Sequence, residues 1–196
     1  MEPDSSADID LITRGDLIGL GPLRRDLLTT YQRWMNDLNV TRTLGAPSRP
    51  MTTEREQQWA DSALISPDPA FTIYTLDNMR PIGNTSLFDI DVGNATCYFG
   101  ILIGERDAWG HGYGTEATRL MLAYAFDVLG MQNVTLTANA DNVRGLRAYE
   151  RAGFRRIGVR RNATQVGRRR IDEVLMDAIP DDFEPSYLDR VMHPGG

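Results

Sequence analysis

The stretch of sequence that decides the fold is Trp109-Gly110-His111-Gly112-Tyr113-Gly114. An alternating apolar segment, residues 96–103, precedes it, and apolar residues at helical spacing follow it up to residue 128. This order predicts a strand, a glycine loop and a helix. Glycines at the start of a helix leave backbone N–H groups unshielded, and the helix dipole adds partial positive charge there. The sequence therefore predicts a site for an anionic group such as a phosphate.

The rest of the chain alternates strand and helix signals around this loop. We expect Asp26 to cap a first helix that ends near Leu38, and Thr52 or Thr53 to cap a second, where Thr53-x-x-Glu56 has the form of a capping box. The expected strands cover residues 17–23, 71–76, 82–90, 96–103, 134–138, 159–164 and 170–178, with a short helix at 142–151. An antiparallel meander before the loop, and strand, helix, strand after it, predict a mixed α/β fold. A dinucleotide-binding fold fits poorly, because it needs an early strand-helix-strand unit.

Composition limits the possible functions. A chain of 196 residues with 41% hydrophobic residues suits one globular domain, expected at 11–180, between a disordered tail at 1–10 and a C-terminal tail at 181–196. All 21 basic residues are arginine, so lysine Schiff-base chemistry and the lysine of a nucleotide P-loop are excluded. One cysteine and two histidines predict no disulfide and no metal site. No segment suits a membrane span or a secretory signal, so we expect a cytoplasmic protein.

Charge is unevenly distributed along the chain. The net charge of −6 argues against a nucleic-acid partner, and residues 1–105 hold eight arginines against 15 acidic residues. Residues 144–170, in contrast, hold ten arginines and one acid. This cluster is a solvated face, an RNA-binding patch or a seat for one polyanionic ligand, and its small extent favours the single ligand over RNA.

Two separated motifs resemble those of the GNAT N-acetyltransferase superfamily. The glycine loop is similar to the acetyl-coenzyme A motif, Gln or Arg-x-x-Gly-x-Gly or Ala, with Trp109 in place of the usual Gln or Arg. That replacement is typical of the branch of ribosomal-protein alanine N-acetyltransferases. Asn142-Val143-Arg144-Gly145-Leu146-Arg147-Ala148-Tyr149-Glu150-Arg151-Ala152-Gly153-Phe154 resembles the family's Asn-x-x-Ser/Ala-x-x-x-Tyr-Glu-Lys-x-Gly-Phe. The resemblance covers roughly residues 17–179. It implies a mostly antiparallel sheet of about seven strands with flanking helices, splayed at a cofactor cleft.

The resemblance also implies which residues bind acetyl-CoA, the acetyl donor. Tyr149 would be the general acid beside the sulfur atom, although a core aromatic is the alternative interpretation. No general base transfers, because relatives use Ser where this chain has Gly145. The expected cofactor-binding residues are Ile101, Leu102, Ile103, Trp109, Gly110, His111, Gly112, Tyr113, Gly114, Thr115, Asn142 and Arg147.

The acceptor implied by the family is a primary amine. A protein N-terminal α-amine is our first interpretation, since an amine with a pKa near ~8 needs little help from a base. The alternatives are a small-molecule amine (polyamine, aminoglycoside or amino sugar) and a non-catalytic acyl-CoA-binding module. A homodimer is possible by analogy with relatives. The expected acceptor-binding residues are Trp34, Asn36, Asp37, Asp89, Asp91 and Tyr98.

Overall fold

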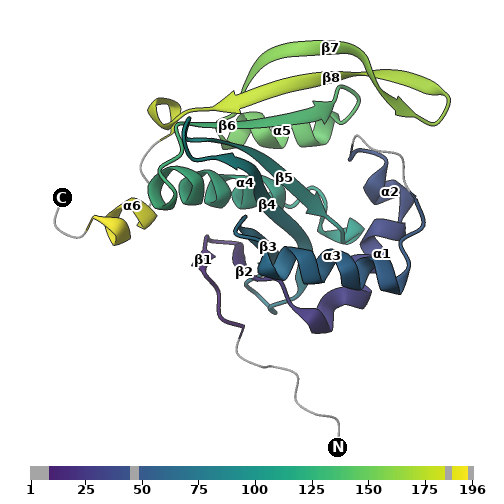
Figure 1. Ribbon diagram of the computed structural model, residues 1–196, viewed down its shortest axis with the longest axis horizontal. Helices are drawn as coiled ribbons and strands as arrows, with labels where there is room; N and C mark the ends of the chain where they lie inside the picture. The colour runs from purple at the N-terminus through teal and green to yellow at the C-terminus, as the bar shows by residue number, and fades with distance from the viewer. Residues whose placement is uncertain (1–8, 45–48, 184–186, 194–196) are drawn as a thin grey trace, which may run out of the picture.

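Eight strands form one sheet in the computed structural model, which describes residues 9–44, 49–183 and 187–193. The strands lie in the order β1-β2-β3-β4-β5-β6-β8-β7 (Figure 1). Their bounds are β1 Thr13–Arg14, β2 Ile18–Pro22, β3 Ala70–Thr75, β4 Pro81–Asp91, β5 Thr96–Ile103, β6 Asn133–Asn139, β7 Arg155–Val166 and β8 Arg169–Ala178. Every neighbouring pair is antiparallel except β5 and β6. The mixed, mostly antiparallel fold is confirmed, with one strand more than expected. The extra strand is β1, whose two residues are too few to show an alternating pattern.

The sheet opens between β5 and β6. These two strands pair only where Thr96, Cys97 and Tyr98 face residues 133–135. Beyond that point β5 continues along β4 as far as Ile103, whereas the rest of β6 pairs with β8. The backbone of residues 99–103 therefore has no strand partner on its β6 side within the described chain, and the predicted splay is confirmed.

Helices cover the sheet and close its ends. They are η1 Arg25–Leu27, α1 Leu28–Asn36, α2 Leu38–Thr41, α3 Thr53–Ile65, η2 Arg106–Ala108, α4 Tyr113–Ala123, η3 Tyr124–Val128, α5 Val143–Ala152, η4 Pro180–Asp182 and α6 Tyr187–Met192. Figure 1 shows α1, α2 and α3 together at one end of the molecule and the long β7–β8 hairpin along another side. Residues 117, 121, 122 and 125, on one face of α4 and η3, are fully buried in the main core.

One expected helix cap is wrong, one is confirmed, and an expected capping box is missing. Asp26 does not cap the first helix, because its carboxylate binds the Arg24 guanidinium at 2.9 and 2.8 Å. The capping box at residues 53–56 is also absent. Thr52, one of the two expected candidates, caps α3, and its Oγ1 accepts the Arg55 N–H at 3.3 Å. Glu56 is therefore not needed at the helix start, and its side chain turns inward.

The tails expected at residues 1–10 and 181–196 lie partly outside the residues that the structure describes. Residues 1–8 are not described, whereas Leu188 in α6 is buried and α6 contacts η3. Among the described residues, no helix is both long and apolar enough to cross a membrane.

Candidate functional site

The glycine loop joins β5 to the start of α4. Gly110 and Gly112 have φ angles of 86° and 88°, the left-handed region that L side chains rarely adopt. A Cβ built on Gly110 meets nothing within 4 Å, and one on Gly112 meets only Leu17 Cδ1 at 3.7 Å. Backbone conformation, and not crowding, therefore requires these glycines. No described side chain caps α4, so the N–H groups of its first turn remain available to an anion.

Trp109 fixes the loop against the strand. Its indole N–H donates to the Ile103 carbonyl oxygen at 2.9 Å, and the Arg144 guanidinium lies 3.8 Å from its ring centroid. The residue that replaces Gln or Arg in the motif thus links the end of β5 to α5. The hydrogen bond from Trp109 occupies the carbonyl oxygen of Ile103 at the end of β5.

Glu116, in the first turn of α4, holds the start of β2 beside the loop. Its carboxylate accepts the backbone N–H groups of Asp16 and Leu17 at 2.9 Å each and of Ile18 at 2.8 Å. Three charge-assisted hydrogen bonds from backbone N–H groups to one carboxylate join the start of β2 to the first turn of α4.

Helix α5 forms the facing wall. Asn142 caps it, with its Oδ1 accepting the Gly145 N–H at 3.1 Å. A Cβ on Gly145 would lie 2.4 Å from Asn142 Nδ2, so glycine makes room for the cap. Tyr149 is half-buried, with its ring edge-on to Phe99 and Phe154. Burial raises the pKa of Tyr149 to about 12, so its phenol stays protonated at neutral pH.

These elements enclose a cleft of about 500 Å³. The structure brings nearly all of the expected cofactor-binding residues together on its walls, and Tyr149 with them. The exception is His111, which is exposed and stacks on Tyr113 with 5.7 Å between ring centroids. The expected residues that line the cleft are Ile101, Leu102, Ile103, Trp109, Gly110, Gly112, Tyr113, Gly114, Thr115, Asn142, Arg147 and Tyr149.

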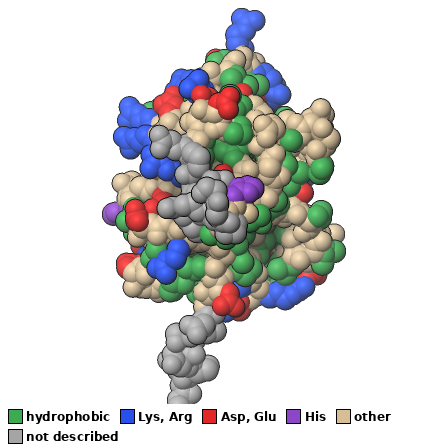
Figure 2. All heavy atoms as spheres, turned by 90° about the vertical axis from the view of Figure 1, so that its left-hand side faces the viewer, with side chains coloured by type: hydrophobic (Ala, Val, Ile, Leu, Met, Phe, Trp, Pro, Cys, Tyr) green, Lys and Arg blue, Asp and Glu red, His purple; other side chains and the backbone are tan. Residues whose placement is uncertain are grey.

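The arginine cluster divides between the cleft and the β7–β8 hairpin. Arg144, Arg147 and Arg151 line the cleft. On β7, Arg155 and Arg156 pair with Asp182 and Glu150, and Arg160 pairs with Glu173. Figure 2 shows the face that lies on the left in Figure 1. Several basic side chains are near its top, which is the side where Figure 1 places β7 and β8. Only the α5 members are placed to meet a ligand in the cleft.

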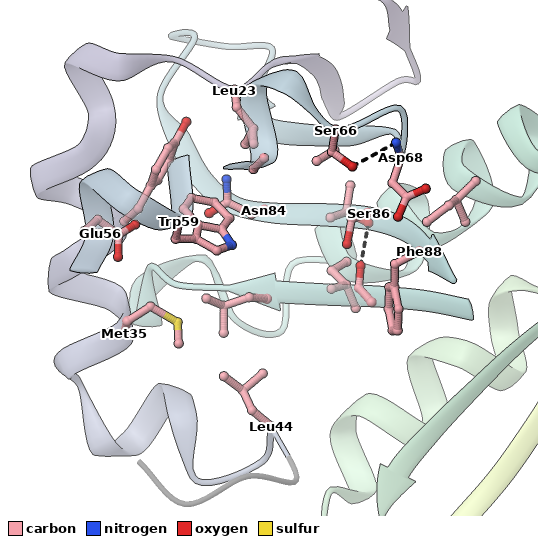
Figure 3. Close-up of a pocket in the computed structure, with 18 of the residues that line it drawn as sticks. Leu23, Met35, Leu44, Glu56, Trp59, Ser66, Asp68, Asn84, Ser86 and Phe88 are labelled. Carbon is pink, nitrogen blue, oxygen red and sulfur yellow. Dashed lines mark hydrogen bonds between the residues drawn. The ribbon is translucent and has the colours of Figure 1, made fainter. Parts of the chain in front are cut away.

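A second pocket, of about 400 Å³, lies between α1, α3 and strands β4 and β5 (Figure 3). It shares Leu44, Ile101 and Leu102 with the cleft, so the two hollows meet at β5. Its lining includes two acids, Glu56 and Asp68, and no basic residue.

Glu56 is the unusual member of this lining. It is 2% exposed, and none of the described residues donates a hydrogen bond or forms an ion pair with its carboxylate. Burial raises its pKa above the ordinary value of a glutamate. Sequence reasoning missed it because Thr53-x-x-Glu56 resembles a capping box. The available signal was its spacing to Trp59, Ala60 and Ala63, which places a carboxylate on the inward face of α3.

The six residues expected to bind the acceptor lie elsewhere. Trp34 is 1% exposed and its indole N–H donates to Glu105 at 2.8 Å, while Asn36 binds both backbone groups of Met51. Asp37 caps α2, and Asp91 accepts from Asn94 in the β4–β5 turn. The remaining two, Asp89 and Tyr98, are exposed at the outer end of the β4–β5 hairpin. None of the six lines either hollow.

Among the described residues, no group of three or more His, Cys, Asp or Glu side chains is placed to hold a metal ion.

Comparison with known proteins gives a consistent result. The acetyltransferase (GNAT) domain family matches residues 18–155. A Bacillus subtilis (strain 168) protein described as "Probable N-acetyltransferase YjcK" is 33% identical over 114 residues, which cover 57% of this chain and 62% of that protein's length. The fold is similar to that of spermidine N-acetyltransferase from Vibrio cholerae, solved with CoA and spermine (TM-score 0.77, 19% identity, 84% of this chain and 96% of that one). It is also similar to that of a GNAT-family acetyltransferase from Bacillus anthracis (TM-score 0.74, 17% identity, 88% and 98%).

Proposed function

Because this chain belongs to the acetyltransferase (GNAT) domain family, we propose that it moves the acetyl group of acetyl-CoA directly to a primary amine. The observation that carries the proposal is the meeting of two different hollows at Leu44, Ile101 and Leu102. One hollow offers backbone N–H groups and arginines, which suit a phosphate-bearing donor. The other is apolar with acidic groups, which suits an amine.

The cleft fits the donor in its details. The uncapped start of α4 and the open space beside Gly110 and Gly112 would receive the pyrophosphate. The unpaired edge of β5 at residues 99–103 would bind the pantetheine arm as a neighbouring strand would. Arg147 and its α5 neighbours would bind the remaining phosphate. Bound in this way, acetyl-CoA supplies the activated thioester carbon.

Tyr149 is the proposed general acid. In the transfer, the amine nitrogen forms a bond to the acetyl carbon, the carbon–sulfur bond breaks, and the amine loses a proton as the thiolate gains one. A phenol with a pKa of about 12 remains protonated through the neutral range and donates to the thiolate as its charge develops. The residues shared by the two hollows are apolar and include no base. The amine therefore attacks in its neutral form. The proton that its nitrogen loses once the bond to carbon has formed passes to water, from which Tyr149 regains the proton that it gave to sulfur.

For the acceptor, the pocket supports a small cationic amine, because its lining holds two acids, Glu56 and Asp68, and no basic residue. The similar fold of an enzyme solved with spermine gives this acceptor further support. A protein N-terminal α-amine is the second candidate, supported by the resemblance of residues 109–117 to the ribosomal-protein branch.

Thiol release from acetyl-CoA tests the function. The panel contains peptides with N-terminal Ala, Ser or Met, spermidine, an aminoglycoside and an amino sugar, with glycerol as the control that lacks an amine. We expect release with at least one amine and none with glycerol, and turnover of only one class would identify the acceptor. Tight acetyl-CoA binding with no release across the panel would favour the non-catalytic acyl-CoA-binding alternative.

The pH dependence of kcat/KM tests the absence of a base. We expect its acidic limb to follow the pKa of the substrate amine as the amine is varied. A limb that stays fixed for amines of different pKa would instead reveal an enzyme carboxylate acting as the base.

A further inference from the structure

We propose that Glu56 is the receptor for a second cationic group on the acceptor, so that the preferred substrate is a primary amine joined to another cation by an apolar spacer. This inference rests on the proposed function, since it concerns the acceptor pocket of the same site. It adds a specificity-determining residue and the chemical form of the amine.

The environment of the Glu56 carboxylate is unusual. Glu56 is 2% exposed and has no described partner for its charge, although it lines a pocket of about 400 Å³. Buried carboxylates are ordinarily paired, because an unpaired buried charge is strongly unfavourable. A group of this kind at the wall of a cavity is matched to a ligand that supplies the missing partner.

The pocket lining favours a partner with a positive charge. The other ionisable acid in the lining is Asp68, and no arginine lines the pocket. The aromatic ring of Trp59 lies one helical turn from Glu56 and is edge-on to Tyr31, with 6.0 Å between the ring centroids. Aromatic faces and a carboxylate together favour an ammonium group. The second group is therefore a cation and not an anion.

Glu56 lies away from the boundary where the amine is proposed to react. The residues shared with the cofactor cleft are Leu44, Ile101 and Leu102, and Glu56 is not among them. Figure 3 shows Glu56 with Trp59 and Met35 at the end of the pocket away from Phe88. If the reacting amine lies at the shared boundary, Glu56 can bind a different group of the same molecule. The lining between them is largely apolar, which suits a methylene spacer.

The test compares linear diamines with monoamines of the same chain length, using spacers of increasing length. We measure kcat/KM for acetyl transfer and, independently of turnover, the binding of each amine by calorimetry. The expected result is a preference for one diamine over its matched monoamine of about tenfold or more, the factor given by a hydrogen bond to a charged group. Glu56→Gln should remove this preference, whereas Glu54→Gln, on the exposed side of the same helix, should keep it.

The outcomes separate this inference from the proposed function. Equal binding of diamines and monoamines to the unchanged protein, or a preference that survives Glu56→Gln, overturns the role of Glu56 even if acetyl transfer occurs. Absence of turnover with every amine, together with diamine binding that depends on Glu56, overturns the proposed reaction and supports the cation site. A fall in the preference for both variants would also contradict the inference, because it would reflect a general disturbance of α3.

Discussion

The two hollows differ in how the chain builds them. The cleft proposed for the cofactor takes most of its lining from two stretches, residues 101–115 and 142–151. The pocket proposed for the acceptor takes its lining from a wider span, residues 23–102, with isolated residues of α1 and α3 beside the strand runs 84–88 and 100–102. Phosphate recognition by backbone groups requires consecutive residues with defined φ angles, whereas recognition of an amine needs only side chains that meet in space. A motif can reveal the first kind of site but not the second.

Glu105, which is partly buried, and Glu56, which is buried, show how partners in the fold change the state of a shielded carboxylate. Glu105 receives ion pairs from Arg33 and from Arg80, the latter at 3.1 Å, and a hydrogen bond from Trp34 at 2.8 Å. Burial alone would raise the pKa of Glu105, but the bonds from Arg33 and Trp34 outweigh it and hold the pKa below the ordinary value. Glu56 has burial without partners, and its pKa is raised. The fold itself supplies the partners of the Glu105 carboxylate, whereas the proposed partner of the Glu56 carboxylate is a ligand.

The largest expected effect is that of Gly112→Val on the cleft. Valine at a φ of 88° costs about 2–3 kcal/mol in strain, and its branched side chain also obstructs the phosphate. We expect acetyl-CoA affinity, measured by calorimetry, to fall roughly a thousandfold. Gly158→Val is the control, because a Cβ there meets nothing within 4 Å and Gly158 is on β7, outside the cleft. A loss below tenfold for Gly112→Val would mean that the loop does not hold the phosphates.

Next in size is Tyr149→Phe. It removes the phenol O–H while keeping the ring that packs on Phe99 and Phe154. We expect kcat to fall about a hundredfold or more, with acetyl-CoA affinity nearly unchanged. Steady-state kinetics and calorimetry on the same preparation separate the two quantities. Equal losses in both would assign Tyr149 to binding and not to proton transfer.

Glu105→Gln should have a moderate effect on stability. Loss of the charge weakens its bonds with two arginines, and we expect about 2 kcal/mol of destabilisation and a Tm lower by roughly 4–8 °C at pH 7. Because the folded-state pKa is lowered, the stability from Glu105 is present above its ordinary pKa and is lost as pH falls through the folded value. The difference between variant and parent should therefore shrink in acid. Asp107→Asn, which removes the exposed partner of Arg80, should change Tm less, and equal changes would contradict the special role of Glu105.

The smallest expected effect has the opposite sign. Glu56→Gln removes a buried, unpaired charge, so the free protein should gain roughly 0.5–1 kcal/mol at pH 7, a Tm increase of about 2 °C. The raised folded-state pKa means that the penalty is present at high pH and disappears as pH falls through that pKa. Thermal unfolding between pH 4 and 8 should show a gain that grows with pH. Destabilisation at pH 7 would show that Glu56 has a partner in the fold and would weaken the binding interpretation.

Much of the fold could be predicted from the sequence, because the strands before the glycine loop alternate regularly and the loop lies where a strand meets a helix. The cleft was predictable for the same reason, since its residues follow one another along the chain. The missing cap at Asp26 and the missing capping box at residues 53–56 have a common cause. Each sequence pattern is compatible with two local hydrogen-bonding arrangements. In the structure, Arg24 binds the Asp26 carboxylate, and the Thr52 hydroxyl caps α3 by accepting the Arg55 N–H.

The acceptor side could not be predicted in this way. Residue type and sequence position favour Trp34 and Asp91 as acceptor residues, but the first is held in the core by Glu105 and the second closes a hairpin turn. Whether a polar side chain on a helix faces a pocket or a neighbour depends on contacts with distant residues. The ribosomal-protein branch likewise remains a proposal, because it depends on the acceptor.

The narrow pairing of β5 with β6 has a consequence for how the protein opens. Three register pairs join the five strands of the first half of the sheet to the three of the second, so the halves are expected to behave as separate cooperative units in hydrogen exchange. Amide protons on the free edge of residues 99–103 would exchange readily. A ligand lying along that edge would extend the hydrogen-bonded ladder between the halves and slow exchange in both, so substrate binding would also stiffen the whole sheet.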